Sequence, residues 1–112
     1  MDSRYFHFKM NDNSMDDGKK HSISKGDIMV CTPIGLGNIN VGDVIVARID
    51  KRIVVGVVER KANGVVITSH YNPTSVSNRI LTRRAEFYLV VETRHKRGGS
   101  FDDMVICLRG IA

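Results

Sequence analysis

Short apolar runs with a period of two, interrupted by turn-forming residues, constrain the fold of this chain most strongly. Seven segments carry the pattern, and clusters of Gly, Asn, Asp and Pro separate them. No segment shows the 3.6-residue period of an amphipathic helix, although residues 11–20 could hold one helical turn capped by Asp12 or Asn13. The pattern predicts an all-β barrel or sandwich. The expected strands span residues 4–10, 27–31, 43–49, 52–60, 64–69, 86–94 and 103–109.

Four connections have the sequence of tight turns. Asn63-Gly64 lies between two valine-rich runs, which is a strong hairpin signal, and residues 95–102 join the last two strands into a second expected hairpin. The segments 24–27 (SKGD) and 40–43 (NVGD) both place Gly-Asp ahead of a strand. Glycine permits the backbone of a tight turn, and aspartate accepts hydrogen bonds from neighbouring amides. We interpret the strands that follow these two segments as entering one barrel through the same kind of turn.

The length and composition indicate one soluble domain. A chain of 112 residues has the usual length of a single domain, and 42% apolar with 26% charged residues is typical of globular proteins. The longest apolar runs, such as IVVGVV, are too short to cross a bilayer, and no signal peptide is visible. Cys31 and Cys107 lie in apolar β-like runs, so we expect both to be reduced and buried in a cytoplasmic protein.

The net charge of +5 comes largely from basic residues late in the chain. A solvated face accounts for them, because no RNA-binding aromatic signature, zinc-finger spacing or DNA-reading helix accompanies the charge. We therefore expect only weak, sequence-independent binding to DNA, which disappears near physiological salt. The residues concerned are Arg79, Arg83, Arg84, Arg94, Lys96 and Arg97.

No metal or cofactor site is indicated. If NDNSMDDG were a calcium loop with Gly18 as its glycine, Met15 would take a ligand position and Ser24 the place of the bidentate Glu. The segment PIGLGN lacks the lysine and the following helix of a phosphate loop. The histidines show no paired ligand spacing; they are His7, His21, His70 and His95.

Ser14 is the remaining candidate for chemistry, because it follows the first expected strand and directly precedes the apolar Met15. This arrangement, with the two Gly-Asp turns and a late Asn-Pro, resembles the C-terminal domain of the LexA, phage-repressor and UmuD family. The resemblance covers residues 4 to about 93 and leaves 101–112 as a C-terminal strand extension. It implies a partly open barrel of coiled β-sheets, related to bacterial signal peptidases, in a single domain over residues 1–112. The matching residues are Ser14, Met15, Gly26, Asp27, Gly42, Asp43, Asn72 and Pro73.

The family resemblance implies a serine–lysine peptidase with Ser14 as the nucleophile. Asn13 stands where the family usually has Asp, and Asp12 where it has Gly. A serine hydroxyl needs a neighbouring base, which in this family is a buried lysine. Counted without a gap from residues 47–50 (ARID), the lysine position is Gly56, and a shift of one residue gives Val55 or Val57; none of the three can accept a proton. The residues before the first strand also lack the Ala-Gly or Cys-Gly bond that family members cleave in themselves.

We therefore expect a catalytically silent domain of this type, acting as an oligomerisation or regulatory module of a transcriptional regulator. It would form a homodimer, with the C-terminal tail paired to residues 86–94, and with a DNA-binding domain or chain outside these 112 residues. Two alternatives remain. One is an active serine–lysine peptidase that takes its base from Lys19, Lys20 or Lys51; the other is a small basic β-barrel that binds nucleic acid.

Overall fold

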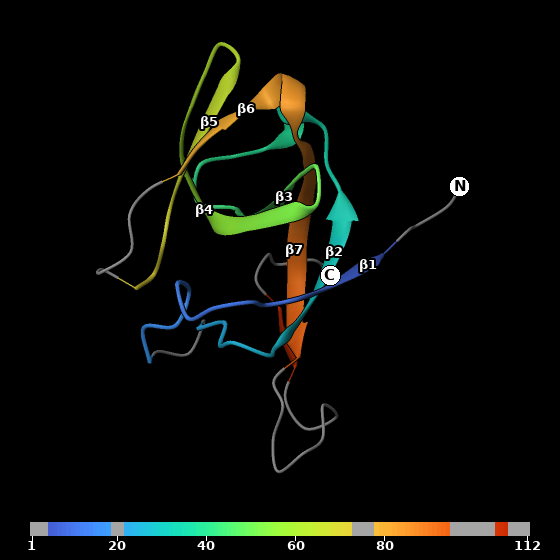
Figure 1. Cartoon of the computed structure of the whole chain (residues 1–112), viewed down its shortest axis with the longest axis vertical. Coiled ribbons are helices and arrows are strands. Elements are labelled where there is room, and N and C mark those ends of the chain that lie inside the picture. Colours follow the sequence, from blue (N-terminus) through green and yellow to red (C-terminus); the bar gives the residue numbers. More distant parts are fainter. Residues whose placement is uncertain (1–4, 19–21, 73–77, 95–104, 108–112) are drawn as a thin grey trace.

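The chain forms one curved antiparallel β-sheet, seen in a computed structural model (Figure 1). The structure describes residues 5–18, 22–72 and 78–94, together with the backbone of 105–107. Two 3-10 helices, η1 (Leu36–Asn38) and η2 (Thr82–Arg84), join strands. The strands are β1 (Phe6–Lys9), β2 (Ile28–Pro33), β3 (Val44–Ile49), β4 (Arg52–Ala62), β5 (Val65–Ser69), β6 (Asn78–Leu81), β7 (Glu86–Arg94) and β8 (Val105–Cys107).

The long strand β7 organises the sheet. The strand order is β1-β2-β7-β3-β4-β5-β6. One edge of β7 pairs with β2, while its other edge pairs first with β3 and then with β8. In Figure 1, β7 runs nearly vertically and β3 and β4 turn across it, so that the sheet curls into a half-barrel. The partly open all-β architecture is therefore confirmed.

All seven predicted strands are present, with ends shifted by a few residues. The predicted pairing of the tail with residues 86–94 is confirmed in part, because β8 pairs with Glu92–Arg94. The sequence analysis missed β6 and both 3-10 helices. The helical turn suggested for residues 11–20 was wrong for 11–18, where the structure has only turns, bends and one bridge. The connection 95–102 lies outside the described residues.

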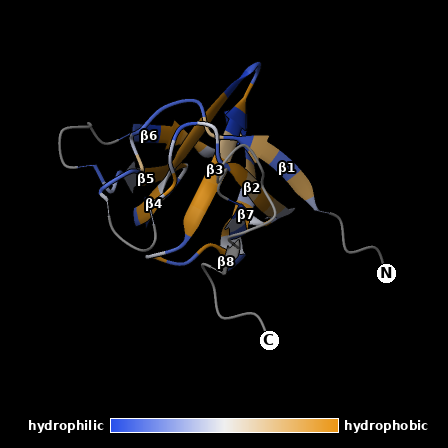
Figure 2. Cartoon of the chain, turned by 90° about the horizontal axis from the view of Figure 1, so that it is seen from below, coloured by the Kyte–Doolittle hydropathy of each residue, from blue (hydrophilic) through white to orange (hydrophobic). Residues whose placement is uncertain are grey.

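Apolar side chains pack on both faces of the sheet, and Figure 2 shows β3 as a strongly apolar strand inside the molecule. Strand β4 contributes to both faces by alternation. Ile53 and Val55 pack with the first cluster, which includes Met15, whereas Val54 and Val58 pack with the second. Gly56 therefore lies on the second face, between Val54 and Val58 in the alternation.

The two Gly-Asp turns have the same hydrogen bonds, as their sequences predicted. In each turn the aspartate carboxylate accepts from the backbone N–H three residues earlier, at 2.8 Å. The glycines adopt left-handed φ angles of 95° and 96°, which suit a residue without Cβ. The first turn also holds the end of β1, because Gly26 N donates to the Met10 carbonyl at 2.9 Å and Met10 N donates to the Asp27 carbonyl at 2.8 Å.

Cys31 is a free, fully buried thiol, as predicted. Burial raises the pKa of the Cys31 thiol to about 12, so it packs as a small hydrophobic residue rather than a reactive group. The side chain of Cys107 lies outside the described residues. Among the residues that the structure describes, no helix has the length and hydropathy to cross a bilayer.

Candidate functional site

Ser14 lies half-buried in the loop between β1 and the first Gly-Asp turn. Its neighbour Met15 is fully buried and forms an isolated antiparallel bridge with Ile23, whose N–H donates to the Met15 carbonyl at 2.9 Å. The methionine therefore fixes the loop to the core. The strand stops before this point because the next residues bond to each other rather than to a neighbouring strand.

Local polar side chains form hydrogen bonds with backbone groups of the serine loop, residues 11–18. The Asp12 carboxylate accepts from the Ser14 N–H at 3.0 Å, and Asn13 Oδ1 accepts from the Lys25 N–H at 3.0 Å. The Asn13 carbonyl also accepts from the Asp16 N–H at 3.0 Å. Asp and Asn often form such local bonds, which compete with helix formation. These bonds explain why residues 11–18 form a loop of defined conformation and not a helical turn.

Asn72, from the late Asn-Pro pair, joins the serine loop to the segment after β5. Its backbone N–H donates to the Ser14 carbonyl at 2.9 Å, and its side-chain Nδ2 donates to the Asn13 carbonyl at 3.3 Å. Two motif positions that are far apart in sequence therefore meet at the candidate site. Pro73 lies outside the described residues.

Hydrogen bonds from the Ser14 hydroxyl and the Ser14 amide lower the pKa of the Asp12 carboxyl below its ordinary value of 3.8. The charges of His70 and Lys25 lower this pKa further, and burial opposes them. A carboxylate with a lowered pKa is a poor proton acceptor. Asp12 is therefore a poor candidate for the base that Ser14 would need.

Asp12→Asn should make the protein less stable than the wild type at neutral pH. Because the pKa of Asp12 is lowered in the folded state, its stabilisation is present above the unfolded value and is lost as the pH falls through the folded value. The stability gap between Asp12→Asn and wild type should therefore close below pH 3.8. Urea unfolding at neutral and acidic pH tests this, with the exposed Glu59→Gln as the charge control. A difference in stability between Asp12→Asn and wild type that persists in acid would contradict this prediction.

Gly56, the position of the missing lysine, lies in β4 opposite Ile45 and is buried. A Cβ atom at this position would lie 2.7 Å from Thr68 Cβ, 2.8 Å from Thr68 Oγ1 and 2.9 Å from the Ser69 carbonyl oxygen. These separations are shorter than real Cβ contacts. The space for a side chain at residue 56 is therefore occupied by β5, and only glycine fits without a shift of that strand.

Thr68, which closes position 56, and His70, two residues later, both carry buried polar atoms. Thr68 Oγ1 and His70 Nδ1 are buried, and neither has a hydrogen-bond partner within the described part of the chain. His70 Nε2 lies 3.1 Å from Asn78 Nδ2, and the His70 charge acts on Asp12. The sequence analysis considered His70 only as a metal ligand and did not single out Thr68. In the sequence, Thr68, His70 and Asn72 follow one another at intervals of two residues, and this spacing was the signal that could have identified Thr68 and His70.

Of the three lysines considered as alternative bases, the structure describes Lys51 alone. Lys51 is exposed in the turn between β3 and β4, whereas Lys19 and Lys20 lie outside the described residues. Lys25, which the sequence analysis did not consider, contacts the loop through its backbone N–H, which donates to Asn13 Oδ1. Lys25 is exposed, whereas the family resemblance implies a buried lysine as the base.

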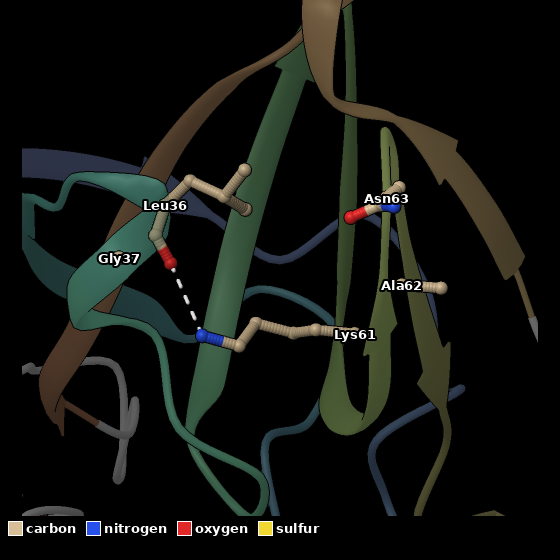
Figure 3. A pocket seen from close by; sticks show the side chains of 5 residues that line it. All are labelled: Leu36, Gly37, Lys61, Ala62 and Asn63. Carbon is tan, nitrogen blue, oxygen red and sulfur yellow. Dashed lines mark hydrogen bonds between the residues drawn. The ribbon is translucent and has the colours of Figure 1, made fainter.

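An open pocket of about 310 Å³ lies at the tip of the β4–β5 hairpin, against η1 (Figure 3). Lys61 Nζ donates to the Leu36 carbonyl across it, at 3.3 Å. None of the serine-loop residues lines this pocket. Within the described ranges, no group of three or more His, Cys, Asp or Glu side chains is arranged to hold a metal ion. The pocket lining is Leu36, Gly37, Lys61, Ala62 and Asn63.

Comparison with known protein families identifies a match over most of the chain. A family model described as Peptidase S24-like matches residues 1–91. This range includes the serine loop, the closed position on β4 and Asn72, and it ends before β8. No curated protein sequence matches the chain.

Proposed function

Because this chain belongs to the Peptidase S24-like family, we propose that it is a catalytically silent member that acts as an oligomerisation or regulatory module of a cytoplasmic transcriptional regulator. The DNA-binding domain or chain would lie outside these 112 residues. The closed position at Gly56 carries the proposal, since a serine without a proton acceptor is a weak nucleophile. Labelling of Ser14 with a serine-directed phosphonate is the test, and we expect none.

The surroundings of Ser14 support this proposal. Ser14 lies in a loop of defined conformation, beside the buried Met15 and the hydrogen bonds from Asn72. These contacts fix the position of Ser14 but supply no base. The Ser14 amide donates to the Asp12 carboxylate, whose pKa is lowered. At the lysine position the β5 backbone and Thr68 leave no room for a side chain. A domain that keeps its fold after losing catalytic activity still offers surfaces for assembly.

A homodimer is the assembly that we expect, formed at the edge where β8 extends the sheet. β8 pairs with the end of β7 and is attached to the sheet only there among the described strands. A strand with one unpaired edge readily pairs with another chain. Sedimentation at micromolar concentration should show a dimer, and the dimer should persist when salt is raised. A monomer at every concentration would remove the oligomerisation role for this chain.

An active serine peptidase is the second candidate, and His70 is the observation that favours it. The imidazole acts electrostatically on Asp12, which accepts from the Ser14 N–H, and imidazole is the usual base for a serine nucleophile. In that case phosphonate labelling of Ser14 would be present in the wild type and lost in His70→Gln. This result would replace the silent assignment.

A further inference from the structure

Among the described strands, β6 is the last of the sheet and has one unpaired edge, and the direction of its backbone groups follows from its pairing with β5. Thr82 N donates to the Gly64 carbonyl at 3.0 Å, in register with the pairing of Ile80 with Val66. In an antiparallel ladder, hydrogen-bonded pairs alternate with pairs whose N–H and C=O groups point outward. The N–H and C=O groups of Arg79 and Leu81 therefore point away from β5, to the free edge.

The side chains of these two residues lie on one face of the sheet. They alternate with Ile80, which is 2% exposed and packs into the core. Leu81 is 42% exposed, and Arg79 is exposed in a cross-strand row with Ile67 and Arg60. The edge thus presents an apolar and a cationic side chain two residues apart, beside two outward-facing sets of backbone groups.

Positive charge surrounds this edge. Arg83 and Arg84 of η2 follow Leu81 directly and are exposed. The ion pairs within the described residues are Arg48–Glu86 and Arg94–Glu92, so the arginines at the β6 edge have none. A second copy of this edge would oppose like charges, which destabilises strand pairing. The charge instead complements an acidic partner.

We propose that the free edge of β6 binds an extended acidic peptide of another protein, which adds as a strand to the sheet. Backbone hydrogen bonds to Arg79 and Leu81 would supply affinity, and the alternate side chains would supply specificity. An antiparallel peptide would place an apolar residue opposite Leu81 and, two residues later, an acidic residue opposite Arg79. This role is separate from the serine loop and from the dimer edge.

Fluorescence polarisation with a short labelled peptide, Leu-Thr-Glu flanked by threonines, tests the proposal. Leu81→Pro removes the outward N–H, and Leu81→Ala is its matched control because both lose the leucine side chain. Proline fits here because Leu81 has φ of −75° and its N–H faces outward. The dissociation constant should be about tenfold higher for Leu81→Pro than for Leu81→Ala. Matching urea midpoints would show that both variants fold.

A charge exchange provides the second arm and keeps the test decisive if Leu81→Pro does not fold. Arg79→Glu should abolish binding of the Leu-Thr-Glu peptide, and a Leu-Thr-Lys peptide should bind this variant instead. Equal binding to Leu81→Pro and Leu81→Ala would overturn strand addition. Failure of the charge exchange, or binding of labelled duplex DNA with no binding of the peptide, would overturn the acidic-peptide assignment, the latter in favour of nucleic acid.

Discussion

Gly56→Ala is expected to lower the free energy of unfolding by about 1–3 kcal/mol, although alanine is usually favoured over glycine in a strand. The added methyl group would lie under 3 Å from Thr68 Cβ, Thr68 Oγ1 and the Ser69 carbonyl. Because one of these atoms belongs to the backbone, a rotamer change cannot relieve the contact, and β4 and β5 must separate. Chemical denaturation measures the loss.

Gly37→Ala is the matched control, because a Cβ there would meet nothing within 4 Å. We expect its stability to stay within about 0.5 kcal/mol of the wild type. Thr68→Gly removes two of the three contacts, so its cost should be smaller in the Gly56→Ala background than in the wild type. A neutral Gly56→Ala, or strictly additive effects, would contradict the close approach of the two strands.

Met15→Ala is expected to lower the free energy of unfolding by about 2–5 kcal/mol, the range for truncating a large buried side chain. Met15 is 0% exposed and packs among Met10, Ile23, Met29 and Tyr88. Its loss would leave a cavity under the serine loop and weaken the bridge to Ile23. Urea unfolding measures the change, and hydrogen exchange at residues 13–16 should speed up.

Val41→Ala serves as the control for methyl loss, because Val41 is 68% exposed. It should change stability by less than about 0.5 kcal/mol. If Met15→Ala were equally mild, Met15 would not be the anchor that fixes the serine loop, and the position of Ser14 would need another explanation.

The parts of the fold that could be predicted from sequence depend on local chemistry. The two Gly-Asp turns form as expected, because glycine and aspartate act within four residues of each other. The period-two runs become strands because one or both faces are buried. The apolar Met15 is buried in the core, as its side chain favours, and Ser14 beside it is half-buried.

Features that depend on contacts between distant segments could not be predicted. Strand β6 has a short, basic sequence and is held by its register with β5. From the sequence alone, Gly56 was only the position of a missing lysine. A single Gly56→Lys substitution could then have restored the lysine at a modest cost in stability. The structure changes this expectation, since a lysine at residue 56 would force β4 and β5 apart and would lie on the face opposite the cluster that contains Met15. Only the fold brings these residues together.

Reactivity of Ser14 in the wild-type chain tests the central claim most directly. Intact-mass spectrometry after incubation with a fluorophosphonate, from mildly acidic to alkaline pH, would detect an adduct. An active family peptidase serves as positive control and Ser14→Ala as negative control. The proposed loss of the proton acceptor predicts no adduct on the folded wild type at any pH, while the active peptidase is labelled. Labelling of the wild type that is absent from Ser14→Ala would contradict the claim.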